Sequence, residues 1–313
     1  MENKNYDLIL KELGLIEEKI IFKNDRKKRV TSLVKDNNDK NYILKWNCES
    51  NKKELENLKN EIIFYNKLKY NFIPKLMKHG KNYILIEYIE SYSLREWTLN
   101  YLKLKKDDFL EDEFKIVIKK MCEIFSNFYL INDKIKFEKR QLHYELKEMS
   151  NKLLLSGPMG TKPNVFYKMT NSIVRKLFLE KRVLNIVGQV KDLKSSFIHR
   201  DLHLNNLLIE KNKNKLFLID LENSSEGLIV RDLCYIYPML YLLLEGKENH
   251  RSYLEKIFYE KHPDKNNLCE YKKINKFLLK VISLNNRFRK DISILQYLKL
   301  LKDFILIKEE KVI

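Results

Sequence analysis

The most informative stretch of this sequence is Phe197-Ile-His-Arg-Asp-Leu-His-Leu-Asn-Asn-Leu-Leu-Ile209, followed shortly by Leu216-Phe-Leu-Ile-Asp-Leu-Glu222. Two apolar runs of β type within it, 207–210 and 215–219, flank the polar tetrapeptide Lys211-Asn-Lys-Asn214. This pattern predicts a hairpin with a four-residue loop. Folding the chain about that loop sets Asn206 roughly opposite Ile219, and therefore beside Asp220.

Polar side chains gather at the mouth of this hairpin. The amide oxygen of Asn206 and the carboxylate of Asp220 form a pair of hard oxygen ligands that suits Mg²⁺. Asp201 lies five residues before Asn206, where its carboxylate is placed to accept the proton of an attacking hydroxyl. The spacing matches the catalytic loop H-R-D-x-x-x-x-N of kinases, with a later metal-binding Asp. We therefore predict a phosphoryl-transfer site with Asp201 and His199 in its catalytic loop, His199 chiefly bracing the loop by hydrogen bonding.

A second hairpin and a helix near the N-terminus supply the other expected parts of such a site. Strands at 29–34 and 41–46 flank a turn rich in Asn and Asp, and Lys45 on the second strand is the candidate for the nucleotide phosphates. Ser50 is expected to cap a helix that runs to about Leu68. Glu61, sixteen residues after Lys45, is our first choice for its carboxylate partner, and Glu56 is the second.

With these residues in place, the chain resembles the aminoglycoside phosphotransferase and choline kinase-like family of the protein-kinase-like superfamily. His-x-Asp-x-x-x-x-Asn and Ile-Asp-x-Glu segments recur in that family, and the resemblance extends from about residue 15 to 240. It implies an α+β, two-lobed protein-kinase-like fold. Residues 1–89 would form a nucleotide-binding lobe with a small antiparallel β-sheet and a helix, and residues 90–313 a mostly helical lobe with the catalytic loop and acceptor site.

The resemblance also implies ATP or GTP as phosphate donor and Mg²⁺ as cofactor. Glu87, Tyr88 and Ile89 end an expected strand, 84–89, whose backbone would meet the nucleobase. Two departures from the family pattern stand out. The loop 22–29 has no glycine to cover the phosphates, and Arg200 gives His-Arg-Asp, as in protein kinases, where most of the family has glycine.

Further residues near the motif are kept as possible contributors without an assigned role. Glu222 would be a third metal ligand if the strand continued past Asp220. Asp232 falls where family members commonly carry an Asp that leads a helix. The remaining two are Arg200 and His203.

Composition narrows the class of protein. The 313 residues contain no alanine, and the formal net charge of +18 comes from 50 lysines against 11 arginines. Evenly spread lysine is unlike the local arginine-rich stripe of nucleic-acid readers, so we expect no nucleic-acid partner. The run at 23–29 is read as a solvated hairpin. Four scattered cysteines, a polar start and the absence of a long apolar stretch predict a cytoplasmic protein without a transmembrane segment. Nothing in the sequence sets the oligomeric state.

The leading function is Mg²⁺-dependent transfer of a phosphoryl group to a hydroxyl of a small molecule of the aminoglycoside, choline or sugar type. A protein kinase is one alternative, and a glycolipid kinase is another. A nucleotide-binding pseudokinase scaffold, from a different class, would require the loss of a catalytic residue that this chain retains. Possible acceptor contacts are the acidic run 107–113, the pair Glu309 and Glu310, and the loop 156–163. Each also has an ordinary structural explanation, such as complementing a helix dipole.

Overall fold

The computed structural model divides into two compact units, 1–124 with 199–225 and 125–198 with 226–313. The residues that it describes are 2–26, 28–48, 50–68, 70–105, 108–129, 138–156, 180–211 and 215–288. Among them, no helix has both the length and the apolar character required to cross a membrane. The expected lobe boundary near residue 90 stays a prediction.

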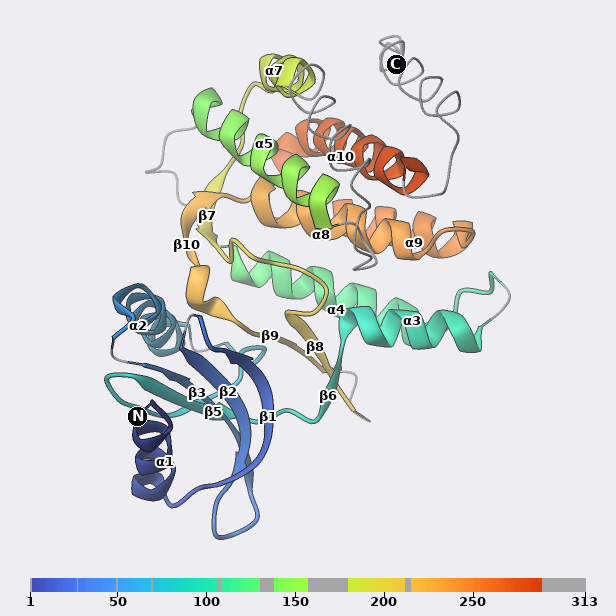
Figure 1. The fold of residues 1–313 in the computed structure, drawn as a ribbon. Coiled ribbons are helices and arrows are strands. Elements are labelled where there is room, and N and C mark those ends of the chain that lie inside the picture. The colour runs from blue at the N-terminus through green and yellow to red at the C-terminus, as the bar shows by residue number, and fades with distance from the viewer. Residues whose placement is uncertain are drawn as a thin grey trace. The chain divides into compact units, whose positions relative to one another are not determined.

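The first unit is built on a five-stranded antiparallel sheet (Figure 1). Its spatial order is β1-β2-β3-β5-β4, and helix α1 (Glu2–Leu13) precedes it. The strands are β1 (Ile16–Asn24), β2 (Arg29–Lys35), β3 (Asn41–Asn47), β4 (Leu76–His79) and β5 (Tyr83–Glu87). The order explains how β3 comes to lie between β2 and β5 in the middle of the sheet.

Alternation along β2 and β3 separates the two faces of this sheet. Val30, Ser32 and Val34 are buried, and so are Leu44 and Trp46 on β3. Most of these residues share one core with Tyr6 and Ile9 of α1, so α1 covers this face. The opposite face, which carries Lys45, is left for the charged residues of the site. The two expected strands are confirmed.

Helix α2 (Lys52–Lys67) follows β3, as expected, but its cap differs from the prediction. Asn51, and not Ser50, is the N-cap, since its side chain accepts the N–H of Glu54 at 3.3 Å. The Ser50 hydroxyl instead lies 3.3 Å from the Nζ of Lys28. The helix therefore begins about one residue later than the sequence suggested.

The predicted catalytic hairpin is present. It consists of β8 (Leu207–Glu210) and β9 (Leu216–Leu218), and β6 (Ser91–Ser93) joins it to make a three-stranded sheet. Leu207 pairs with Leu218, and the N–H of Ile219 donates to the carbonyl of Asn206 at 3.0 Å. The predicted proximity of Asn206 and Ile219 is thus confirmed.

Two strand ends differ from the sequence prediction. β5 stops at Glu87, so Tyr88 and Ile89 lie beyond it in irregular backbone. After β9 the strand does not continue through Glu222, because Leu221–Asn223 forms a 3₁₀ turn, η2. Both ends are points where the chain leaves a sheet next to the site.

Helices predominate among the described residues from 94 to 288, apart from short strands. They are α3 (Leu94–Leu104), α4 (Asp112–Phe128), α5 (Lys139–Ser156), α7 (Glu180–Gln189), α8 (Val230–Leu243), α9 (Glu248–Glu260) and α10 (Leu268–Phe288). β7 (Ser195–Ile198) and β10 (Ser225–Leu228) pair as a two-stranded sheet, and η3 (Lys265–Asn267) precedes α10. The α+β fold class is confirmed.

Candidate active site

The lysine and glutamate predicted in the first unit form a buried ion pair. Lys45 Nζ lies 2.7 Å from Glu61 Oε1, and both side chains are at least nine-tenths buried. β3 supplies the lysine from the face opposite α1, and α2 supplies the glutamate. The alternative partner, Glu56, is exposed on α2. The helix register inferred from sequence spacing therefore brings Glu61, and not Glu56, to Lys45.

Lys45 also contacts the metal-site aspartate, with Nζ 2.8 Å from Asp220 Oδ1. Burial by itself would lower the pKa of the Lys45 ammonium, but the charges of Asp220 and Glu61 outweigh it and raise the pKa above its ordinary value. The Lys45 charge in turn lowers the pKa of Asp220 to about 2. Both groups are therefore fully charged at neutral pH.

Asp220 reaches this position through an unusual backbone. Its φ of 65° and ψ of 56° are left-handed, a conformation that is strained for residues other than glycine and somewhat tolerated by Asp and Asn. This residue links β9 to η2 and ends the hairpin. Arg200, the neighbour of Asp201, is also left-handed with φ 67°. Strained residues of this kind tend to cluster at functional sites.

The catalytic loop is closed by hydrogen bonds between its ends. His199 donates from Nε2 to the carbonyl of Ile219 at 2.8 Å, which is the bracing expected of it. The Asn206 side-chain amide donates to the carbonyl of Asp201 at 3.0 Å. Because its nitrogen is engaged there, the amide oxygen of Asn206 is the atom left to face a cation. The loop is thus held at both ends of the Asp201–Asn206 segment.

Asp201 itself remains accessible, with its side chain 37% exposed. Its Oδ2 lies 4.0 Å from Nε2 of His203. Burial lowers the pKa of His203, and the Asp201 charge only partly opposes that effect. At neutral pH the His203 ring is therefore uncharged.

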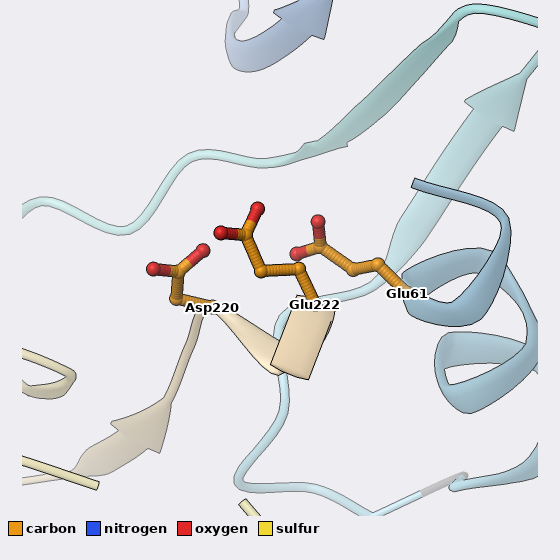
Figure 2. Close-up of side chains that lie close together, drawn as sticks. All are labelled: Glu61, Asp220 and Glu222. Atoms are coloured by element: carbon orange, nitrogen blue, oxygen red, sulfur yellow. The ribbon is translucent and has the colours of Figure 1, made fainter. Parts of the chain in front are cut away.

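Three carboxylates converge where the sequence predicted a cation. Glu61, Asp220 and Glu222 each offer an oxygen, and these oxygens all lie within 4.8 Å of one another (Figure 2). Figure 2 shows them arriving from α2, from the end of β9 and from η2. Carboxylate oxygens are ligands of the kind Mg²⁺ prefers. Each of the three also contacts a basic side chain, Glu61 and Asp220 that of Lys45 and Glu222 that of Arg29. Asn206 and Asp220 stay the predicted metal ligands, and Glu222 lies where it could join them.

Arg29 is a member of this charged group that the sequence analysis did not single out. Its NH1 lies 2.6 Å from Glu222 Oε2 and 3.5 Å from Glu54 Oε2, and its NH2 lies 3.9 Å from Asp220 Oδ1. With 11% of its side chain exposed, Arg29 does not belong to a solvated hairpin, so that expectation is wrong for this residue. Glu54 is likewise buried. Strand alternation from Lys45 was the signal that could have found Arg29.

The residues predicted to meet the nucleobase lie at the end of β5. The Glu87 carboxylate accepts the N–H of Lys75 at 3.2 Å, and the Ile89 carbonyl accepts the hydroxyl of Ser91 at 2.9 Å. The base-binding role of these residues stays a prediction.

Asp232 belongs to the second unit, in the first turn of α8, as expected from its spacing. It is buried and accepts the hydroxyl of Tyr129 at 3.0 Å. This contact ties the end of α4 to the start of α8.

The acidic run has structural partners where the structure describes it. Asp112 and Glu113 lie in the first turn of α4, where acidic residues complement the helix dipole. Glu111 pairs with Lys105 at 2.7 Å, and Glu113 accepts the indole N–H of Trp97 at 3.3 Å. Asp107, the loop residues 157–163, and Glu309 with Glu310 lie outside the described residues.

Comparison with known proteins agrees with this site. Residues 174–250, which include the catalytic hairpin, match the model of the phosphotransferase enzyme family. No curated protein matches the chain in sequence. Several solved structures share its fold.

An ethanolamine kinase of Plasmodium vivax is 14% identical, with 97% of this chain and 86% of that chain covered and a TM-score of 0.52. The aminoglycoside phosphotransferase APH(3'')-Id of Streptomyces rimosus is 11% identical, with 88% and 98% covered and a TM-score of 0.50. The ADP-bound aminoglycoside phosphotransferase APH(2'')-Ib is 13% identical, with 98% and 97% covered and a TM-score of 0.50.

At these identities the similarity shows the fold, and the family match covers the segment that holds the catalytic loop. The chain therefore has the fold of these kinases and phosphotransferases, and its residues 174–250 resemble the phosphotransferase enzyme family.

Proposed function

We propose that this protein transfers the γ-phosphoryl group of ATP, with Mg²⁺, to a hydroxyl of a small molecule. The observation that carries the proposal is the contact of Lys45 with both Glu61 and Asp220. Asp220 belongs to the same chain segment as Asp201 and Asn206. A lysine oriented by a helix glutamate, next to a metal-site aspartate, is the arrangement used to hold nucleotide phosphates in kinases. The ADP-bound relative supports a nucleotide donor.

In the proposed reaction the acceptor hydroxyl attacks the γ-phosphorus, and the P–O bond to the leaving ADP breaks. The Asp201 carboxylate hydrogen-bonds the hydroxyl and takes its proton as the new P–O bond forms. Lys45 offsets negative charge on the donor phosphates. When bound, Mg²⁺ neutralises charge on the phosphate oxygens, and Asp220, Asn206 and Glu222 would hold it.

The catalytic contribution of this chain is chiefly positioning. Lys45 is held from two sides, His199 closes the catalytic loop, and the accessible Asp201 side chain is left for the acceptor. Such fixed geometry avoids reorganisation during the reaction. The donor preference for ATP over GTP is part of the proposal.

A small-molecule acceptor fits better than a protein. Protein kinases place a long peptide-docking segment after the metal-binding Asp. Here eleven residues separate Asp220 from Asp232, and α8 already begins at Val230. Amino alcohols, amino sugars and glycolipid head groups are the acceptor classes to test, since relatives act on ethanolamine and aminoglycosides by name.

The test is nucleotide consumption by the purified protein across a panel of aminoglycosides, choline, ethanolamine and amino sugars, with ATP and GTP in parallel. One acceptor should stimulate ATP consumption and gain a phosphate detectable by mass spectrometry. Asp201→Asn should lower turnover on that acceptor by about 10²- to 10⁴-fold, because the proton acceptor is lost. Its nucleotide affinity should stay within about tenfold. Wild-type turnover in this variant would remove Asp201 from the mechanism.

A further inference from the structure

Arg29 is fixed in the first unit by the sheet that carries it. It is the first residue of β2 and pairs with Asn24 on β1 and with Asn47 on β3. Next to it, the carbonyl of Lys28 accepts the N–H of Cys48 at 2.9 Å. The backbone of Arg29 is therefore fixed by pairing on both sides. Only the side-chain conformation then determines where the guanidinium lies.

The side chain of Arg29 projects from the same face of the sheet as Lys45. Lys45 is directly opposite Thr31 on β2, and opposite residues of an antiparallel pair share a face. Arg29 is two residues before Thr31, and residues two apart along a strand also share a face. Arg29 and Lys45 are thus diagonal neighbours that approach Asp220 from adjacent strands.

The two cations are held in parallel ways. Lys45 is bound to the α2 glutamate Glu61, and Arg29 lies between Glu54 of α2 and Glu222 of η2. Both lie near the same oxygen of Asp220, at 2.8 Å and 3.9 Å. A buried arginine requires such partners, because an unpaired buried charge is strongly unfavourable.

The loop before Arg29 has no glycine, and its Lys28 occupies a left-handed conformation with φ 52°. Glycine-rich loops bring backbone N–H groups close to phosphate oxygens. A guanidinium offers several N–H donors in a planar fork that matches phosphate oxygens. Arg29 can therefore supply from a side chain what the loop backbone does not.

We propose that Arg29 is a phosphate-binding residue of the donor nucleotide site, positioned by Glu222 and Glu54 as Lys45 is positioned by Glu61. The proposal rests on the proposed function, since it requires a nucleotide at this site. Arg29 and Lys45, on neighbouring strands, would then both bind the phosphate chain of the nucleotide. The affinity of the protein for a nucleotide would therefore depend on how many phosphates the nucleotide carries.

The test compares Arg29→Ala and Arg29→Lys with Lys23→Ala, which removes a cation from an exposed pair with Asp25 on the same hairpin. Calorimetry is run with Mg-ATP, Mg-ADP and adenosine. Arg29→Ala should weaken Mg-ATP binding by about 10- to 100-fold, the range of a charge-assisted hydrogen bond, and Mg-ADP by less. Adenosine should bind within about twofold of wild type. Lys23→Ala should bind all three normally.

Arg29→Lys keeps the charge inside the carboxylate cluster and so preserves the fold if the alanine variant does not. It should bind Mg-ATP with a loss between those of wild type and alanine, because lysine lacks the fork. Equal losses for Mg-ATP and adenosine would show a structural role only and overturn the proposal. Normal Mg-ATP binding by Arg29→Lys and Arg29→Ala would also overturn it. A wild-type protein that binds none of the three ligands would instead refute the proposed function.

Discussion

Two buried ion clusters, one in each compact unit, use the same residue types in different ways. In the second unit, Arg231 of α8 binds Glu148 of α5 through both terminal nitrogens, at 2.9 Å and 3.0 Å, and also contacts Glu145. In the first unit, Arg29 and Lys45 face Glu54, Glu61, Asp220 and Glu222. The Arg231 cluster joins helices α5 and α8, whereas the carboxylates of the first unit converge on one point of the candidate site.

The two clusters differ in how their charged groups are arranged. The Arg231 fork is closed on one carboxylate, a geometry that satisfies both partners. In the first unit four carboxylates surround two cations, and three of their oxygens converge within 4.8 Å. Asp220 also stands there in a strained backbone. Both clusters hold two carboxylates for each cation, so the ratio does not separate them. The convergence of three carboxylate oxygens on one point indicates a site for a cation, whereas the Arg231 fork indicates a structural tie.

The comparison predicts that Arg231→Ala will affect stability and leave the chemistry intact. Removing the guanidinium leaves buried Glu145 without this partner, so we expect a loss of about 3–5 kcal/mol in the free energy of unfolding. Urea unfolding measures it. Turnover per folded molecule should be near that of wild type at low temperature. A large loss of turnover in fully folded protein would contradict the distinction between the clusters.

Asp220→Ala should damage Mg²⁺-dependent nucleotide binding more than Asn206→Ala. A carboxylate contributes a full charge to a hard cation, and an amide only a dipole. We expect about 100-fold weaker Mg-ATP binding for Asp220→Ala and about tenfold for Asn206→Ala, measured by calorimetry with and without Mg²⁺. A nucleotide complex with neither side chain near the metal would refute the assignment.

Lys45→Met should raise the KM for nucleotide and lower turnover, reducing kcat/KM by about 100-fold. Glu61→Gln should have a milder effect of the same kind, about tenfold, since it loosens Lys45 without removing its charge. Glu56→Gln is the matched control, because Glu56 is exposed on the same helix. Steady-state kinetics with nucleotide as the varied substrate measure these changes in KM and kcat/KM. Equal effects of Glu61→Gln and Glu56→Gln would show that Glu61 is not the specific partner of Lys45.

The smallest effect concerns acid pH. The Lys45 charge holds the pKa of Asp220 at about 2 in the folded protein, against its ordinary value of 3.8, so the unfolded chain takes up the proton first as pH falls. Ionised Asp220 therefore contributes stability above about pH 4, on the order of 2 kcal/mol, and this is lost between about pH 4 and 2. The stability difference between wild type and Asp220→Asn should shrink over that window in urea titrations. A constant difference would show that Asp220 is not held by Lys45.

Local patterns predicted much of this site correctly. The β8–β9 hairpin followed from two apolar runs around a polar turn, and it placed Asn206 beside Ile219 without tertiary information. Glu61 followed from helical spacing because only one face of α2 meets Lys45. In both cases a short repeat in the sequence fixes which side chains share a face.

Features set by tertiary contacts were missed. Glu54 resembles an ordinary dipole partner in the first turn of α2, and its burial depends on Arg29 from another strand. The turn at η2 was not predicted, because no sequence pattern indicates the left-handed backbone at Asp220. Asn51 and Ser50 are both good caps, and in the structure Asn51 accepts the N–H of Glu54 while the Ser50 hydroxyl lies near Lys28. Such choices depend on residues far apart in the chain.

The left-handed backbone at Asp220 has a consequence for how this position would respond to selection. Glycine adopts that conformation without the penalty of roughly 1–2 kcal/mol that a side chain brings. Asparagine tolerates it better than most other residues. The ion pair with Lys45 offsets this penalty, since the two effects are of similar size. A library screened only for folded protein should therefore accept glycine and asparagine beside aspartate at 220, and a library screened for phosphoryl transfer should return aspartate alone. The position would show, in a sequence population, that the chemistry selects aspartate there more strongly than folding does.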